Sequence, residues 1–318
     1  MVDFTDYCVI APIIFAMENI SYNKMRSFFF LICFFGIILF ACANSSAQDI
    51  PGGVSFHIYS THTSFPDTAR AKGHLYDNKL YTANEHYRDS TVLIVAPKNL
   101  DAKKKVDLVF WFHGWGNHVD SAAVRYELTK QFIASKRNAV LVLAETAYNA
   151  PDSYGGKLEN PGDFKALVAD VLQGLKTQKI IPEDCTYGHI LLGGHSGAYR
   201  VMARIIKNGQ LPIDEVMLFD ALYAETDIFM DWIKADPQHR FIHLFTDHGG
   251  TLDESKAMVK LVDEAHINNF EVEETALEPA QLLAHPIMFI HSLKEHNDIV
   301  GPDNFRLMLE NTPFLKKL

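Results

Sequence analysis

GGHSGA, residues 193–198, stands between an apolar run and a helix-forming segment. The run at 190–192 predicts the end of a strand, and YRVMARII at 199–206 predicts a helix. Small residues on both sides of Ser196 favour a sharp strand-to-helix turn that presents the serine hydroxyl outward. A glycine turn with an incidental serine is the alternative interpretation.

The remaining chain alternates apolar runs with segments of helical periodicity. The predicted strands are residues 92–96, 106–112, 139–144, 190–192, 216–219, 241–245 and 287–290. The predicted helices are residues 163–178, 199–206, 227–234, 254–266 and 304–310. Because most strands are apolar on both faces, we expect an α/β fold with a mostly parallel sheet flanked by helices. Ligands bind at the carboxyl ends of strands in such sheets, so residues just after each strand are informative.

Residues suited to acyl-transfer chemistry follow several predicted strands. HGWGN at 113–117 follows one strand and Ser196 another, while EHNDIVG at 295–301 comes after the last. With a serine, an acid and a histidine in this chain order, the sequence resembles the α/β-hydrolase fold superfamily over roughly residues 54–318. Ala198 departs from the family pattern G-x-S-x-G, but alanine is small enough to keep the helix close to the strand.

The resemblance implies an esterase-like serine hydrolase with three catalytic side chains. Ser196 needs a base within hydrogen-bond reach, and the family places that base at His296, ahead of the rival His291. The acid is either Asp220 or Asp247. We favour Asp220, because a carboxylate directly abutting an apolar strand is costly to bury unless it is paired, whereas Asp247 stands in a polar, glycine-rich loop.

Backbone N–H groups must face the negative charge that develops on the substrate oxygen. The resemblance implies Gly197 as one donor of this oxyanion hole and Trp115, in the HGWGN loop, as the other. A plain glycine turn is the alternative interpretation of that loop. The residues predicted to line the substrate pocket are His113, Asn117, Tyr154, His195 and Tyr223.

Charge, motifs and cysteine content indicate which partners, cofactors and cross-links the protein is expected to have. The chain has 318 residues and a formal net charge of −10, which argues against nucleic acid as a partner. No cofactor motif and no spacing typical of metal ligands stands out, so we expect neither a cofactor nor a metal. Cys185 is the single cysteine after residue 47, which leaves the mature domain without an internal disulfide.

Residues 1–47 are predicted to be an export signal, followed by a single α/β-hydrolase domain over 48–318. A basic patch at 24–26 precedes an uncharged apolar run at 28–43, and small residues follow it. Met25 is an alternative start, because residues 1–24 add nothing typical of a signal.

Cleavage after Ala47 or after Ala43 fits the small-residue rule. Lipidation of Cys42 and a retained anchor helix are the alternatives. The protein is therefore expected to be exported, as a periplasmic or secreted protein or as a lipoprotein of a bacterial envelope. No stable membrane insertion is expected once the signal is removed.

Two classes of function remain open. The first is an exported serine hydrolase that cleaves a small-molecule or polymer ester through an acyl-enzyme, and the same residues could serve an amide or peptide bond. The second is a non-catalytic envelope binding protein on the same fold, suggested by Ala198 and by the two candidate acids.

Overall fold

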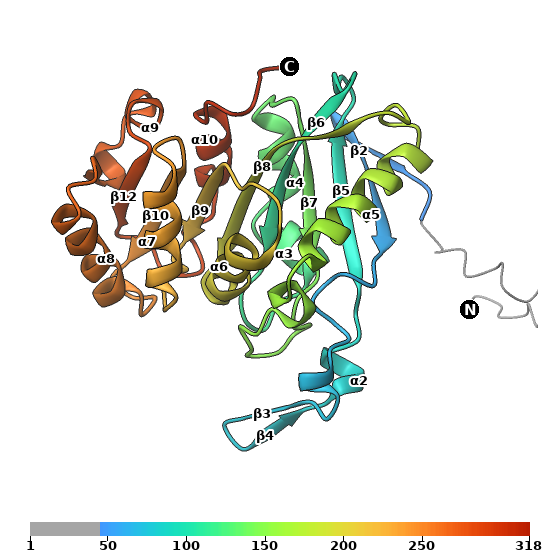
Figure 1. Cartoon of the computed structure of the whole chain (residues 1–318), viewed down its shortest axis with the longest axis horizontal. Helices are drawn as coiled ribbons and strands as arrows, with labels where there is room; N and C mark the ends of the chain where they lie inside the picture. The colour runs from blue at the N-terminus through green and yellow to red at the C-terminus, as the bar shows by residue number, and fades with distance from the viewer. Residues whose placement is uncertain (1–44) are drawn as a thin grey trace, which may run out of the picture. The chain divides into compact units, whose positions relative to one another are not determined.

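The computed structural model describes residues 45–318, which lie in one compact unit (Figure 1). The predicted signal, apart from residues 45–47, and the lipidation candidate Cys42 lie outside the described residues. Among residues 45–318, no helix has the length and apolar character needed to cross a bilayer.

A ten-stranded sheet forms the centre of this unit. Its order is β1 (Gln48–Ile50), β2 (Gly53–Tyr59), β5 (Thr91–Pro97), β7 (Ala139–Ala144), β6 (Lys105–Phe112), β8 (Thr186–His195), β9 (Glu215–Phe219), β10 (Arg240–Thr246), β12 (Ile287–Ser292) and β11 (Phe270–Glu273). The strands from β7 to β11 in this order run parallel, whereas β1, β2 and β5 pair antiparallel. The prediction of a mostly parallel sheet is confirmed.

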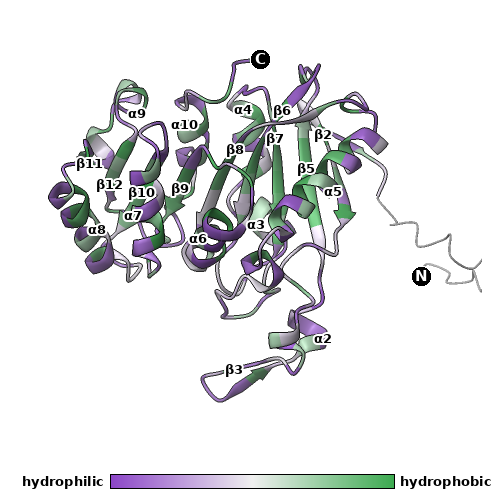
Figure 2. Ribbon diagram, viewed as in Figure 1, coloured by the Kyte–Doolittle hydropathy of each residue, from purple (hydrophilic) through white to green (hydrophobic). Residues whose placement is uncertain are grey.

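Helices pack on both faces of the sheet. One face carries α5 (Asp163–Thr177), α6 (Tyr199–Asn208), α7 (Thr226–Ala235) and α8 (Leu252–Glu264), and the other carries α3 (Val119–Arg125), α4 (Leu128–Ala134), α9 (Pro279–Ala284) and α10 (Asn304–Glu310). Side chains alternate between the two faces along each strand: in β6, Phe110 belongs to the first core and Trp111 to the second. Figure 2 shows apolar strands beneath helices whose other faces are hydrophilic. Each fully buried large apolar side chain contributes about 1.5–3 kcal/mol to this packing.

Several short elements were not predicted from the sequence. They are β1, β2, β11, α3, α4, α9, the helix α2 (Ala83–His86) and the hairpin of β3 (His74–Tyr76) and β4 (Lys79–Tyr81). The hairpin projects from the body of the unit (Figure 1), and Leu75 and Leu80 on it are exposed. Because these segments are short or partly exposed, they have no long apolar run that would mark them in the sequence.

Candidate active site

Ser196 sits on a tight turn between β8 and α6. It is the first residue of the one-turn 3₁₀ helix η3 (Ser196–Ala198), and its φ is +56°. A left-handed conformation at a residue other than glycine costs about 1–3 kcal/mol and therefore marks a constrained position. A Cβ atom at Gly194 would lie 2.6 Å from Met202 Sδ and 2.7 Å from Ala198 Cβ. Strand and helix thus approach so closely that residue 194 must be glycine.

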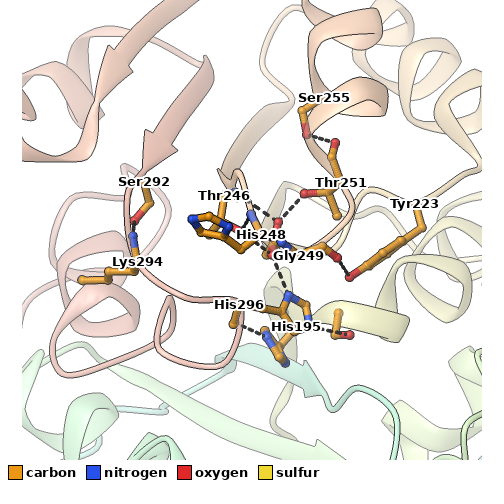
Figure 3. A network of polar contacts seen from close by, with 12 residues as sticks. His195, Tyr223, Thr246, His248, Gly249, Thr251, Ser255, Ser292, Lys294 and His296 are labelled. Carbon is orange, nitrogen blue, oxygen red and sulfur yellow. Dashed lines mark hydrogen bonds and ion pairs between the residues drawn. The ribbon is translucent and has the colours of Figure 1, made fainter.

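The structure brings Ser196, His296 and Asp220 together in one hydrogen-bonded chain. The Ser196 Oγ lies 3.0 Å from His296 Nε2, and His296 Nδ1 lies 2.6 Å from Asp220 Oδ2. Asp247 is not part of this chain, because its Oδ1 lies 2.9 Å from His291 Nε2 instead. Figure 3 shows His296 in a network of polar contacts that also includes His195, Thr246 and Thr251.

The hydrogen bonds fix which ring nitrogen of His296 carries the proton. An ionised carboxylate can only accept, so His296 Nδ1–H donates to Asp220. In the neutral imidazole Nε2 then has a free lone pair, and the Ser196 hydroxyl donates to it. His296 therefore has the tautomer that a general base next to a serine requires.

Asp220 is fully buried and accepts several hydrogen bonds besides the one from His296. Thr246 donates through its backbone N–H at 3.2 Å and its hydroxyl at 2.9 Å, and the Thr251 hydroxyl donates as well. Burial acts to raise the pKa of Asp220, but the hydrogen bonds from His296, Thr251 and Thr246 outweigh it and lower the pKa. Asp220 is therefore a carboxylate at neutral pH.

His195 holds the loop that carries the base. Its Nε2 lies 2.9 Å from the backbone carbonyl of His296, and its Nδ1 lies 3.2 Å from the Tyr126 hydroxyl. Burial, and then the charge of His296, lower the pKa of His195 to about 3. His195 is therefore neutral, and because a carbonyl only accepts, its Nε2–H donates to the His296 carbonyl.

A buried ion pair anchors the HGWGN loop after β6. His113 Nε2 lies 2.6 Å from Glu145 Oε1, and the other oxygen of Glu145 accepts from the Val119 N–H at 3.0 Å. Burial acts to lower the pKa of His113, but the charge and hydrogen bond of Glu145 outweigh it, so the pKa is raised. Because a carbonyl only accepts, His113 Nδ1–H donates to the Gly114 carbonyl at 2.8 Å, and Nε2 faces the Glu145 carboxylate.

The Gly114 carbonyl and the Trp115 N–H belong to one planar peptide unit, so His113 fixes the direction of that N–H. Within residues 45–318 the Trp115 N–H donates to no acceptor. A Cβ atom at Gly114 would lie 2.6 Å from Ser196 Cβ, which shows that this peptide lies against the serine. The Trp115 indole in turn packs on Gly197 and donates to Ser153 Oγ at 2.7 Å.

Two cavities meet at Ser196. The first, the aromatic cavity, has a volume of about 260 Å³ and is lined by Trp115, Ser153, Ser196, Gly197, Tyr199 and Tyr223. The second, the polar cavity, has a volume of about 330 Å³ and is lined by Gly114, Trp115, Asn117, Arg125, Tyr126, His195, Ser196, Tyr223, His296 and Asn297. Both volumes suit a small ligand or one end of a longer chain.

Three of the five residues predicted to line the pocket do so: Asn117, His195 and Tyr223. The prediction for His113 is wrong, because its ring points away from both cavities into the ion pair with Glu145. Burial, and then the charge of Asp220, raise the pKa of Tyr223 to about 12, so this lining group stays a neutral phenol.

The prediction that Tyr154 lines the pocket is also wrong for these two cavities. Its ring lies between two arginines, 4.7 Å from the Arg70 guanidinium and 5.2 Å from that of Arg200. Its hydroxyl donates to Asp67 at 3.1 Å. Through these contacts, Tyr154 holds the loop after β7, to which it belongs, against Arg70, Arg200 and Asp67.

Sequence reasoning missed Arg125, Tyr126, Thr246, Thr251 and Glu145. Thr246 ends β10, and Glu145 directly follows β7, so the strand-end rule could have found both. Arg125 and Tyr126 lie at the end of α3, where no strand-end signal exists. In the described part of the chain, no group of three or more histidine, cysteine or acidic side chains is arranged to hold a metal ion.

The chain was compared with protein families, with curated protein sequences and with solved structures. No protein-family model matches it, and no curated protein sequence is similar to it. Solved structures that resemble it include the fluorophosphonate-binding serine hydrolase F of Staphylococcus aureus, at 10% identity and a TM-score of 0.47, over 83% of this chain and 99% of that one. A CE1 ferulic acid esterase of the anaerobic fungus Anaeromyces mucronatus has 13% identity and a TM-score of 0.49, over 83% and 91%. An S-formylglutathione hydrolase of Agrobacterium tumefaciens has 12% identity and a TM-score of 0.42, over 84% and 99%.

Sequence identities of 10–13% and TM-scores below 0.5 do not carry an activity over to this chain. The serine on a strand–turn–helix elbow, the mostly parallel sheet and the chain order Ser196, Asp220, His296 are the arrangement of the α/β-hydrolase fold. The fold by itself hosts many chemistries.

Proposed function

We propose that the protein is a serine hydrolase that cleaves carboxylic esters through an acyl-enzyme. The observation that carries this proposal is the chain of hydrogen bonds from Ser196 through His296 to the buried Asp220. A serine on a strained elbow, a histidine whose Nε2 faces that serine and a carboxylate behind the histidine are the parts that nucleophilic catalysis needs.

In the first half-reaction, Ser196 Oγ attacks the ester carbonyl carbon while its proton passes to His296 Nε2. The backbone N–H groups of Trp115 and Gly197 donate hydrogen bonds to the carbonyl oxygen and stabilise the negative charge that develops on it. The bond between the carbonyl carbon and the alcohol oxygen then breaks, and His296 donates its proton to that oxygen. Asp220 stabilises the imidazolium that forms in between.

In the second half-reaction, water attacks the acyl-enzyme. His296 takes a proton from the water, the carbon–Ser196 bond breaks, and the proton returns to the serine. The products are a carboxylic acid and an alcohol.

The test compares ester hydrolysis by matched variants, with 4-nitrophenyl acetate as substrate. Asp220→Asn and Asp247→Asn make the same chemical change at the two acids. We expect Asp220→Asn to lower kcat by about 10³–10⁴-fold and Asp247→Asn to leave kcat nearly unchanged. Ser196→Ala and His296→Ala should abolish the reaction above background.

Equal rates for the wild type and Ser196→Ala would overturn the proposal and favour the non-catalytic binding protein. If 4-nitroacetanilide were hydrolysed at a rate comparable to that of the ester, the proposed activity would instead be amide hydrolysis by the same residues.

We also propose that the protein is exported, because a basic patch at 24–26 precedes an apolar run at 28–43 and small residues follow. Fractionation of cells that express the full chain should recover it outside the cytoplasm. Mass spectrometry of its N-terminus would distinguish cleavage after Ala43 or Ala47 from lipidation at Cys42, and an intact cytoplasmic chain would contradict export.

A further inference from the structure

Arg125 is the last residue of α3 and lines the polar cavity beside Ser196 and His296. Most other arginines of residues 45–318 are paired with a carboxylate: Arg70, Arg200, Arg204, Arg240 and Arg306. Arg125 forms no ion pair and donates no side-chain hydrogen bond within the same residues; its guanidinium lies 5.6 Å from the centre of the Tyr126 ring. A cation beside the nucleophile is therefore left without an anion.

The polar cavity holds a second unused donor. Asn117 is only 7% exposed, and its Oδ1 accepts hydrogen bonds from the His118 N–H and the Ser121 hydroxyl. Its amide NH₂ therefore cannot be exchanged with the oxygen, and it donates to no acceptor in the part of the chain that the structure describes. Asn117 lines the polar cavity, so this amide can donate a hydrogen bond to a ligand group there.

No carboxylate lines the polar cavity. Asp298 lies near enough to Tyr126 to act on the pKa of its hydroxyl, but it forms no ion pair with Arg125. Among the residues that line the polar cavity, Arg125 is the one arginine and there is no lysine. The Arg125 guanidinium and the Asn117 amide both line this cavity, and both are hydrogen-bond donors of the kind that a carboxylate accepts.

The position of the base decides which part of an ester occupies the polar cavity. His296 must donate its proton to the leaving alcohol oxygen, and His296 lines the polar cavity but not the aromatic one. The alcohol portion therefore lies in the polar cavity, on the side of Arg125. The acyl portion lies on the other side of Ser196, in the aromatic cavity.

We propose that the preferred substrates are esters whose alcohol portion carries a carboxylate, which Arg125 and Asn117 bind. This inference rests on the proposed ester hydrolysis and names its substrate class. The products are then a carboxylic acid and a hydroxy acid. Because Arg125 is exposed to solvent, the preference for the charged ester weakens as ionic strength rises.

The experiment uses two esters that differ in one charge: 4-acetoxybenzoate and its methyl ester. Their phenol leaving groups differ in reactivity, so the measured quantity is the ratio of their kcat/KM values in each variant relative to the wild type. Arg125→Gln should lower kcat/KM for the charged ester by about ten-fold, mainly through KM, and change that for the neutral ester by less than about two-fold. Arg125→Lys should keep part of the preference, since it keeps the charge but not the planar fork.

Arg88→Gln is the matched control, because Arg88 is exposed, forms no ion pair within residues 45–318 and lines a separate cavity. It removes the same charge and should leave the ratio unchanged. If Arg125→Gln left the ratio of the two kcat/KM values unchanged, whether or not both values fell, the inference would be overturned.

A binding measurement separates this inference from the proposed function. Calorimetry with Ser196→Ala measures the affinities for 4-hydroxybenzoate and its methyl ester, whether or not the wild type hydrolyses esters. Tighter binding of the charged compound that is lost in Ser196→Ala/Arg125→Gln supports the anion site even if ester hydrolysis fails. Equal binding of the two compounds overturns the anion site even if Ser196 is catalytic.

Discussion

At the scale of single residues, backbone strain is found on both sides of His296. Ser196 and Asp220 have φ values of +56° and +47°, although neither is glycine. Each follows the end of a parallel strand, β8 or β9, where the chain must turn sharply to point a side chain at the imidazole. The strain, about 1–3 kcal/mol at each position, is maintained by the packed sheet beneath.

The ion pair of His113 and Glu145 is expected to act on catalysis without touching substrate. Glu145→Gln removes the carboxylate charge that holds the His113 ring, and so loosens the peptide that carries the Trp115 N–H. We expect kcat to fall by about ten-fold or more with little change in KM, because an oxyanion donor acts in the transition state. Steady-state kinetics with 4-nitrophenyl acetate measures both values.

Glu127→Gln is the control for this change, since Glu127 forms only a surface pair with Lys130. A kcat for Glu145→Gln equal to that of the control would show that the ion pair has no part in positioning Trp115. A fall in kcat together with a large loss of thermal stability would be checked by repeating the assay well below the melting temperature.

Sequence reasoning identified the three side chains that meet in the structure, and it favoured Asp220 over Asp247 on the cost of burying a carboxylate. That argument depended only on local sequence, because Asp220 abuts an apolar strand. It could not find Arg125 or Thr251, since each depends on a contact between segments distant in the chain. The catalytic roles of Ser196, His296 and Asp220 stay predictions.

At the scale of elements, the crossing of β8 and α6 sets the position of the nucleophile. The apolar strands at the centre of the sheet were predictable because both of their faces are buried. Edge strands were not: β11, with the sequence FEVE, alternates between half-buried and exposed residues. The hairpin of β3 and β4 packs against the site through Tyr76 and Trp115, whose ring centres lie 5.3 Å apart, and local sequence holds no signal for that contact.

A methyl group at the crossing of β8 and α6 is expected to destabilise the fold. In Gly194→Ala the new Cβ would lie 2.6 Å from Met202 Sδ, so helix and strand must separate. We expect the free energy of unfolding in urea to fall by about 1–3 kcal/mol. Gly301→Ala is the control, because no atom lies within 4 Å of its added Cβ. Equal stability of the two variants would contradict the close approach.

At the scale of the whole molecule, buried histidines are expected to set how stability depends on pH. Burial lowers the pKa of His243 to about 4 and that of His195 to about 3. Between these values and about 6.5, the unfolded chain binds more protons than the folded one, so stability falls as pH decreases, by up to about 1.4 kcal/mol per pH unit for each histidine. His113 has a raised pKa, so its contribution is lost as pH rises above 6.5.

The contribution of these three histidines to the free energy of unfolding is therefore greatest near pH 6.5 and falls on both sides of it. Urea unfolding at intervals from pH 4.5 to 8 measures this profile. His243→Gln should flatten its acid side, whereas the same change at the exposed His266 should not. A slope between pH 4.5 and 6.5 that is the same in His243→Gln as in the wild type would contradict the neutral, buried state of His243.

The central claim is that His296, held by Asp220, makes the Ser196 hydroxyl a nucleophile. Intact-protein mass spectrometry after incubation with a fluorophosphonate tests it most directly, because that reagent phosphonylates an activated serine hydroxyl. The account predicts one adduct in the wild type, located on Ser196 by peptide mapping, none in Ser196→Ala and much slower labelling in His296→Ala. An adduct that forms at the same rate in Ser196→Ala, or a wild type that takes up no label, would contradict it.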